Sequence, residues 1–131
     1  MKAGCVMRCL LVEDNQVLGG ALRDHLIALG LTARWCLSLG DADVAIQAEE
    51  FDLVLLDLNL PDGDGLSLVR RLRSKEDDTP VIVVTAYDQM SDRMNALNSG
   101  ATDFLVKPFS LSALTCAIRS IGFPTSKQFD A

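Results

Sequence analysis

The sequence predicts an α/β domain in which helices cover both faces of one parallel sheet, a doubly wound (βα)5 architecture. Short runs rich in Val, Leu and Ile alternate five times with amphipathic stretches, an order typical of parallel sheets with right-handed crossovers. Two runs, Leu53–Leu56 and Val81–Val84, are apolar without interruption, which indicates central strands covered on both faces. The 131 residues suffice for one domain. It is predicted at residues 7–121, with a leader at 1–6 and a tail or linker start at 122–131.

The boundaries of the elements follow from these runs and from local end signals. The strands are expected, in chain order, at Met7–Val12, Leu31–Cys36, Phe51–Leu56, Pro80–Thr85 and Thr102–Lys107. The helices are expected at Gln16–Leu29, Ser38–Ala48, Asp64–Ser74, Gln89–Ser99 and Ser110–Ile121. Leucines at positions 18, 22, 26 and 29 give the first helix one apolar stripe, and Gly30 and Gly100 stand where the first and fourth helices end. None of these signals explains Gly19 and Gly20, because each glycine inside a helix lowers its stability by about 1 kcal/mol relative to Ala.

Composition and charge exclude several classes of function. The chain carries 12 basic and 18 acidic side chains, a formal net charge of −6, which argues against nucleic-acid binding because phosphate contacts need clustered Lys and Arg. No apolar run approaches the roughly 20 residues of a membrane helix, and no signal peptide is recognisable, so a cytoplasmic protein without membrane contact is expected. The four cysteines form no CxxC pair, which favours reduced thiols over a zinc site.

Polar side chains stand at the carboxyl ends of four of the five expected strands. They are Glu13 and Asp14 after the first strand, Asp57 after the third, Thr85 at the end of the fourth and Lys107 at the end of the fifth. Ligands of doubly wound sheets bind outside the carboxyl ends of the strands. If the first and third strands are neighbours, three carboxylates share this crevice, and two of them repel by about 4 kcal/mol at ~4 Å. Protonation or a bound cation must relieve that repulsion.

The donor set predicts which cation binds and what chemistry follows. All candidate ligands are hard oxygens without a nearby His or Cys, so Mg²⁺, or alternatively Mn²⁺, is expected rather than Zn²⁺. Because phosphate oxygens commonly complete the coordination of Mg²⁺, a phosphoryl donor is the expected partner. A carboxylate can then act as the nucleophile and form an aspartyl phosphate. Lys107 and the Thr85 hydroxyl would contact the other phosphoryl oxygens, where charge develops.

Four segments resemble a known family. They are Leu11–Asn15 (LVEDN), Asp57–Gly65 (DLNLPDGDG), Val84–Ala86 (VTA) and Gly100–Phe109 (GATDFLVKPF). Together they resemble the receiver domain of response regulators from bacterial two-component systems, over nearly the whole chain. The resemblance implies a CheY-like, flavodoxin-like fold with a five-stranded sheet of order 2-1-3-4-5.

The resemblance also implies an acceptor and a set of metal ligands. Asp57 would accept the phosphoryl group from a sensor histidine kinase or from a small acyl phosphate. Asp14 and Asp57 would bind Mg²⁺ directly, together with the backbone carbonyl of Asn59. Glu13 would act mostly through water.

A conformational switch is implied as well. Lys107 would pair with a phosphoryl oxygen, and the peptide bond between Lys107 and Pro108 is expected to be cis. Thr85 and Phe104 match the switch pair of the family, in which the hydroxyl moves to the phosphate and the aromatic ring turns inward. The expected function is therefore a phosphorylation-controlled signalling switch. The chain is not expected to be an enzyme, although it would catalyse its own phosphorylation and dephosphorylation.

Three rival functions fit the sequence less well. A flavodoxin-like protein that binds FMN needs a Ser/Thr/Gly-rich phosphate loop after the first strand, where this chain has Glu13 and Asp14. A phosphatase of the haloacid dehalogenase type needs a DxDx[TV] motif after that strand, and the Asp57 segment lacks the second acid and the right position. A degenerate receiver that acts as a scaffold should lack key residues, and none is missing.

The output of the switch is implied by a closer resemblance to receivers of the OmpR/PhoB type. It rests on Leu60–Arg73 and on three charged residues, Arg93, Asp103 and Arg119, at positions that resemble a dimer face formed by the fourth helix, fifth strand and fifth helix. A homodimer on phosphorylation is expected, with DNA contacted only through an effector domain that this chain does not contain. We expect the receiver of a transcriptional regulator. The alternative is a stand-alone regulator that acts by protein–protein contact.

Overall fold

The structure is a computed structural model that describes residues 7–86, 95 and 97–122. Its main sheet contains five strands, which are β1 (Arg8–Val12), β2 (Thr32–Cys36), β3 (Leu53–Asp57), β6 (Val81–Thr85) and β7 (Asp103–Val106). All pair in parallel, in the order β2-β1-β3-β6-β7. Since β6 and β7 are the fourth and fifth strands of this sheet, the order is the expected 2-1-3-4-5, and the prediction of the fold is confirmed.

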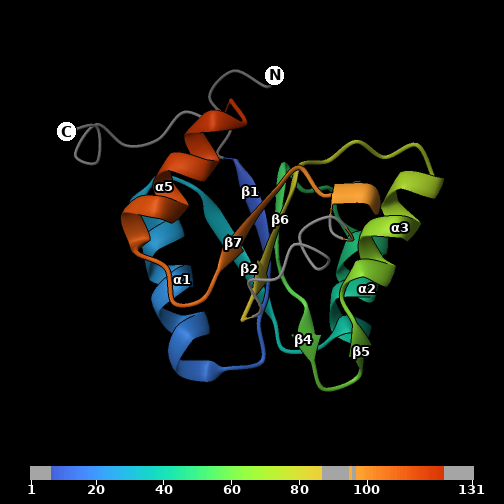
Figure 1. Cartoon of the computed structure of the whole chain (residues 1–131), viewed down its shortest axis with the longest axis horizontal. Helices are drawn as coiled ribbons and strands as arrows, with labels where there is room; N and C mark the ends of the chain where they lie inside the picture. The colour runs from blue at the N-terminus through green and yellow to red at the C-terminus, as the bar shows by residue number, and fades with distance from the viewer. Residues whose placement is uncertain (1–6, 87–94, 96, 123–131) are drawn as a thin grey trace.

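The helices lie in two layers. They are α1 (Gln16–Ala28), α2 (Leu39–Ala48), α3 (Leu66–Ser74) and α5 (Leu111–Ser120). Figure 1 shows α1 and α5 on one face of the sheet and α2 and α3 on the other. Most of the helix predicted at Gln89–Ser99 lies outside the described residues, although Asn95, Leu97 and Asn98 are helical.

Alternation along the strands divides the core between the two faces, because successive side chains of a strand point to opposite sides. Leu10 and Val54 pack in the cluster under α2 and α3, whereas Leu11 and Leu55 pack in the cluster under α1 and α5. Full burial of such side chains contributes about 1.5–3 kcal/mol each. The interpretation of the uninterrupted apolar runs as strands covered on both faces is therefore confirmed.

The ends of the helices and the thiols agree with the sequence. Gly30 and Gly100 have φ angles of 98° and 105°, in the left-handed region that favours glycine after a helix. Three cysteines within the described residues are free thiols, namely Cys9, Cys36 and Cys116. In the part of the chain that the structure describes, no helix has the length and apolar character needed to cross a membrane.

A short hairpin follows β3 and was not predicted. Strand β4 (Asn59–Leu60) pairs antiparallel with β5 (Gly63–Asp64), in a stretch where the sequence predicted a turn and the beginning of a helix at Asp64. The helix begins instead at Leu66, whose backbone N–H donates to Asp64 Oδ1 at 3.0 Å. The prediction was wrong by two residues because Asp64 lies in β5, where it pairs with Asn59, and Gly65 is the N-cap of the helix.

The tip of this hairpin is attached to α2. The carboxylate of Asp62 accepts hydrogen bonds from the backbone N–H groups of Leu39 at 2.9 Å and Gly40 at 3.0 Å. These two bonds lower the pKa of Asp62, since they stabilise its ionised form at a helix N-terminus. The loop that follows Asp57 is thereby held against the second helix.

A buried polar contact joins α1 to α5. The Nε2 atom of His25 lies 2.7 Å from Thr115 Oγ1, and both side chains are buried. The Thr115 hydroxyl donates to the Leu111 carbonyl at 3.1 Å, so its oxygen can accept the Nε2–H of a neutral imidazole. Burial lowers the pKa of His25.

This contact predicts a pH dependence of stability. The pKa of His25 is lower in the folded than in the unfolded protein, so the unfolded state binds the proton more readily, and stability is lost as the pH falls through about 6.5. The variant His25→Gln is expected to lose this part of the dependence. The measurement is the free energy of unfolding in urea of the wild type and of His25→Gln, compared at each pH between 5 and 8. Parallel curves would contradict the expectation.

Candidate functional site

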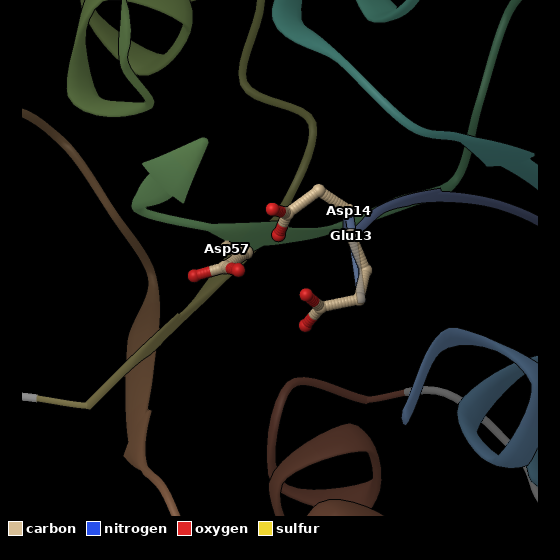
Figure 2. Close-up of side chains that lie close together, drawn as sticks. All are labelled: Glu13, Asp14 and Asp57. Carbon is tan, nitrogen blue, oxygen red and sulfur yellow. The ribbon is translucent and has the colours of Figure 1, made fainter. Parts of the chain in front are cut away.

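Three carboxylates meet at the carboxyl ends of β1 and β3. Oxygen atoms of Glu13, Asp14 and Asp57 all lie within 4.8 Å of one another, and Figure 2 shows the three carboxyl groups arranged around one common space. Glu13 and Asp57 are buried, whereas Asp14 is exposed. The cluster is therefore reached from solvent past Asp14.

The sheet brings these residues together. Strands β1 and β3 are neighbours, with Val12 opposite Leu56, so the residues that follow Val12 and Leu56 emerge side by side. The turn after β1 is held by Asn15, whose backbone N–H donates to Glu13 Oε2 at 3.1 Å and whose Oδ1 accepts from the N–H of Leu18 at 3.0 Å. Asn15 is thus the N-cap of α1 and fixes the Glu13 side chain at the same time.

Lys107 supplies the positive charge of the site. Its Nζ lies 3.2 Å from Glu13 Oε1 and 3.3 Å from Asp57 Oδ2. Partial burial lowers the pKa of this ammonium group, but the two carboxylates outweigh burial and raise it above its ordinary value. The backbone N–H of Lys107 donates to the Thr85 carbonyl at 2.7 Å, and the peptide bond to Pro108 is cis as expected.

In the part of the chain that the structure describes, Lys107 is the one cation found beside these three carboxylates, so the cluster stays acidic. Burial, with the adjacent Asp57 carboxylate as a second cause, raises the pKa of Glu13 to about 7. Within the described residues, Glu13 Oε1 is a buried oxygen that accepts no hydrogen bond of good geometry, although the ammonium group of Lys107 is close to it. A buried carboxylate oxygen whose hydrogen-bonding potential is left unsatisfied by good geometry, in a cluster of hard oxygens, fits a small divalent cation such as Mg²⁺.

Other residues that the sequence singled out lie at or near this edge of the sheet. Asn59 begins β4, two residues after Asp57. Thr85 is the last residue of β6 and is buried. Phe104 lies on the adjacent strand β7, opposite Val83, and packs partly buried against the core under α2 and α3.

The charged residues of the expected dimer face are only partly described. Asp103 begins β7 and Arg119 lies in the last turn of α5. Arg93 lies outside the described residues. The face as a whole therefore stays a prediction.

Two residues that contact or hold the loop around Asp57 were missed as such from the sequence. A Cβ atom on Gly65 would lie 2.8 Å from the backbone oxygen of Asp57 and 3.2 Å from the Cα of Leu58, so this position admits only glycine without a shift of the backbone. Asp62 holds the same loop to α2, as described above. In the sequence, the PDGDG stretch indicates only a turn. The structure shows that the chain comes back after this turn to place Gly65 against the backbone of Asp57.

Comparison with known proteins decides the family of this site. The family model of the response regulator receiver domain matches residues 9–119. The chain belongs to this family. The resemblance noted in the sequence is thereby confirmed, and the three carboxylates of the acidic cluster lie within the matched residues.

Relatives of this receiver include longer regulators. It is 42% identical over 115 residues to the swarming motility regulation protein RssB of Serratia marcescens, and 36% identical over 115 residues to the transcriptional regulatory protein QseB of Haemophilus influenzae. Each alignment covers 88% of this chain and 52% of the relative, so the chain spans about half the length of these proteins.

A solved receiver has the same fold. The non-phosphorylated HemR receiver domain from Leptospira biflexa matches with a TM-score of 0.82 and 34% identity. The match covers 88% of this chain and 93% of that one. Of the two curated relatives, QseB carries the name of a transcriptional regulator, which agrees with the resemblance to receivers of transcriptional regulators.

Proposed function

We propose that this receiver is a phosphorylation-controlled switch in which Asp57 accepts a phosphoryl group from a sensor histidine kinase. The observation that carries the proposal is the juxtaposition of Asp57 with two further carboxylates and one ammonium group, all within a few ångströms. A carboxylate in this setting has further carboxylates beside it that can bind a cation, and an ammonium group in contact with it. Both are what phosphoryl transfer requires.

The transfer assigns a role to each side chain of the cluster. An Asp57 oxygen forms a bond to phosphorus while the bond from phosphorus to the nitrogen of the donor histidine breaks, and the leaving imidazole takes up a proton. Asp14 and Asp57, the Asn59 carbonyl and, through water, Glu13 would hold Mg²⁺. The bound ion would neutralise charge on the phosphoryl oxygens. Lys107 would stabilise the same charge through its ammonium group.

The response of the fold would pass through Thr85 and Phe104. The Thr85 hydroxyl turns toward the phosphoryl group and leaves space that the ring of Phe104 fills. The support for this pair is their location on the neighbouring strands β6 and β7, with Thr85 beside the backbone of Lys107. The resulting change would favour a homodimer through a face that includes Arg93, Asp103 and Arg119.

For the biological output we propose transcription regulation in the cytoplasm, through an effector domain outside this chain. The support is that the chain spans about half of relatives such as the transcriptional regulatory protein QseB. A stand-alone regulator acting by protein–protein contact is the second candidate. Light scattering with and without beryllofluoride tests the dimer, and an unchanged monomer mass would contradict it.

Phosphorylation is tested by the intact mass of the protein after incubation with acetyl phosphate and Mg²⁺. We expect one added phosphoryl group on the wild type, none on Asp57→Asn and none in EDTA. The matched control is Asp24→Asn, which changes an exposed carboxylate on α1 and should leave the mass gain intact. An unphosphorylated wild type, or a phosphorylated Asp57→Asn, would contradict the proposed acceptor.

A further inference from the structure

Trp35 contacts the backbone of the acidic site from the neighbouring strand. Its indole Nε1–H donates to the Glu13 carbonyl at 2.8 Å, and the N–H of Glu13 donates to the Cys36 carbonyl at 3.0 Å. The pairing of β1 with β2 ends one residue earlier, at Val12 opposite Cys36. The indole therefore supplies a donor to a carbonyl beyond the end of the ladder, and two consecutive residues of β2 hold both polar backbone groups of Glu13.

The indole ring of Trp35 packs directly against α1 at Gly19. A Cβ atom on Gly19 would lie 2.1 Å from Cζ2 and 2.4 Å from Cε2 of Trp35, so any side chain at this position overlaps the ring. The adjacent Gly20 differs, because its Cβ would meet nothing within 4 Å. Close approach of the ring thus explains why a helix interior carries glycine at position 19.

A cation covers the ring as well. The guanidinium carbon of Arg23, four residues after Gly19 on α1, lies 5.5 Å from the centre of the Trp35 ring. This distance is typical of a cation–π contact. With Gly19 and Arg23 on the same face of α1, the indole is fixed by packing as well as by its hydrogen bond.

We propose that Trp35 is a positioning residue of the acidic site, which holds the Glu13–Asp14 peptide so that the Asp14 carboxylate meets that of Asp57. The inference rests on the proposed function, since it assigns Trp35 to the metal-binding step of the switch. The physical reason is that Asp14 is exposed and lies in a bend between β1 and α1, where its backbone takes no part in the strand pairing. Holding the Glu13 carbonyl reduces the orientations of the next residue and therefore favours cation binding.

The first test replaces Trp35 by Phe, which keeps an aromatic ring and removes the N–H. Mg²⁺ affinity, measured through backbone amide shifts in ¹H–¹⁵N spectra, is expected to fall about three- to tenfold, the effect of one ordinary hydrogen bond. Phosphorylation by acetyl phosphate should slow at low Mg²⁺ and return to the wild-type rate at saturating Mg²⁺. An unchanged affinity in a folded variant would overturn the proposal.

The second test keeps the indole and displaces it. Gly19→Ala should shift the indole N–H signal of Trp35, the sole tryptophan of the chain, and weaken Mg²⁺ binding to a similar extent. Gly20→Ala, the matched control, should change neither. A displaced indole signal with wild-type Mg²⁺ affinity would overturn the proposal. Failure of the proposed function is distinct, because the wild type itself would then take up neither Mg²⁺ nor a phosphoryl group.

Discussion

Replacement of Lys107 by Met is expected to change Mg²⁺ binding and phosphoryl transfer in opposite directions. The ammonium group lies 3.2 Å from Glu13 Oε1 and 3.3 Å from Asp57 Oδ2, so it competes with a divalent cation for the same carboxylates. Its removal should strengthen Mg²⁺ binding several-fold. Phosphoryl transfer should slow about 100-fold or more, the usual cost of deleting one preorganised stabilising group.

The pH dependence of this variant tests the same argument. Loss of the cation raises the pKa of Glu13 further above its value of about 7, so the gain in Mg²⁺ affinity should grow as the pH rises above neutrality. Affinity is measured by ¹H–¹⁵N titration and transfer by the rate of mass gain with acetyl phosphate. The control is Lys75→Met, an exposed position after α3. Weaker Mg²⁺ binding to Lys107→Met at every pH would contradict the competition.

The second large effect is expected at Gly65. The variant Gly65→Ala places a Cβ atom 2.8 Å from the backbone oxygen of Asp57 and 3.2 Å from the Cα of Leu58. Both are backbone atoms, so neither can move away as the end of a flexible side chain could. The free energy of unfolding should fall by about 1–3 kcal/mol, as for overpacked interiors, and Mg²⁺ affinity should fall with it. The backbone itself does not forbid alanine, since Gly65 has φ −58° and ψ −27°.

The control for Gly65 is the glycine with free space around it. Gly20 lies inside α1 and a Cβ there meets nothing within 4 Å, so Gly20→Ala should stabilise the protein by about 0.5–1 kcal/mol. Urea unfolding followed by circular dichroism measures both variants. Equal effects of the two substitutions would show that helix propensity, and not contact with Asp57, governs position 65.

Elements with a clear local signal were predicted almost to the residue. The apolar runs at β3 and β6 do not alternate with polar residues, a pattern typical of strands that are covered on both faces. The ends of both strands lie within two residues of their expected positions. The leucine stripe predicted α1 in the same way. The β4–β5 hairpin was missed because two-residue strands carry no periodicity, and because Asp64 is as suitable for a cap as for a first helical turn.

The residues of the acidic cluster were predicted individually, but their support was not. Glu13, Asp14 and Asp57 were singled out because they follow the first and third expected strands, and acids at the carboxyl ends of these strands share one crevice if the strands are neighbours. Gly65 and Trp35 carry no such signal. Each acts by contact with a backbone atom that lies 8 or 22 positions away in the chain, and backbone atoms are identical in every residue.

The strand order was implied by the resemblance to receiver domains. The sequence by itself determined the apolar strands, the two layers of helices and the identity of the charged groups at the edge of the sheet. These depend on periodicity and on side-chain chemistry, which are properties of single segments. Only the tertiary structure decided which atoms hold the acids in place, why Gly19 differs from Gly20, and that one ammonium group contacts two carboxylates. Such facts arise from close approach between segments, and a distance between segments exists only once the chain has folded.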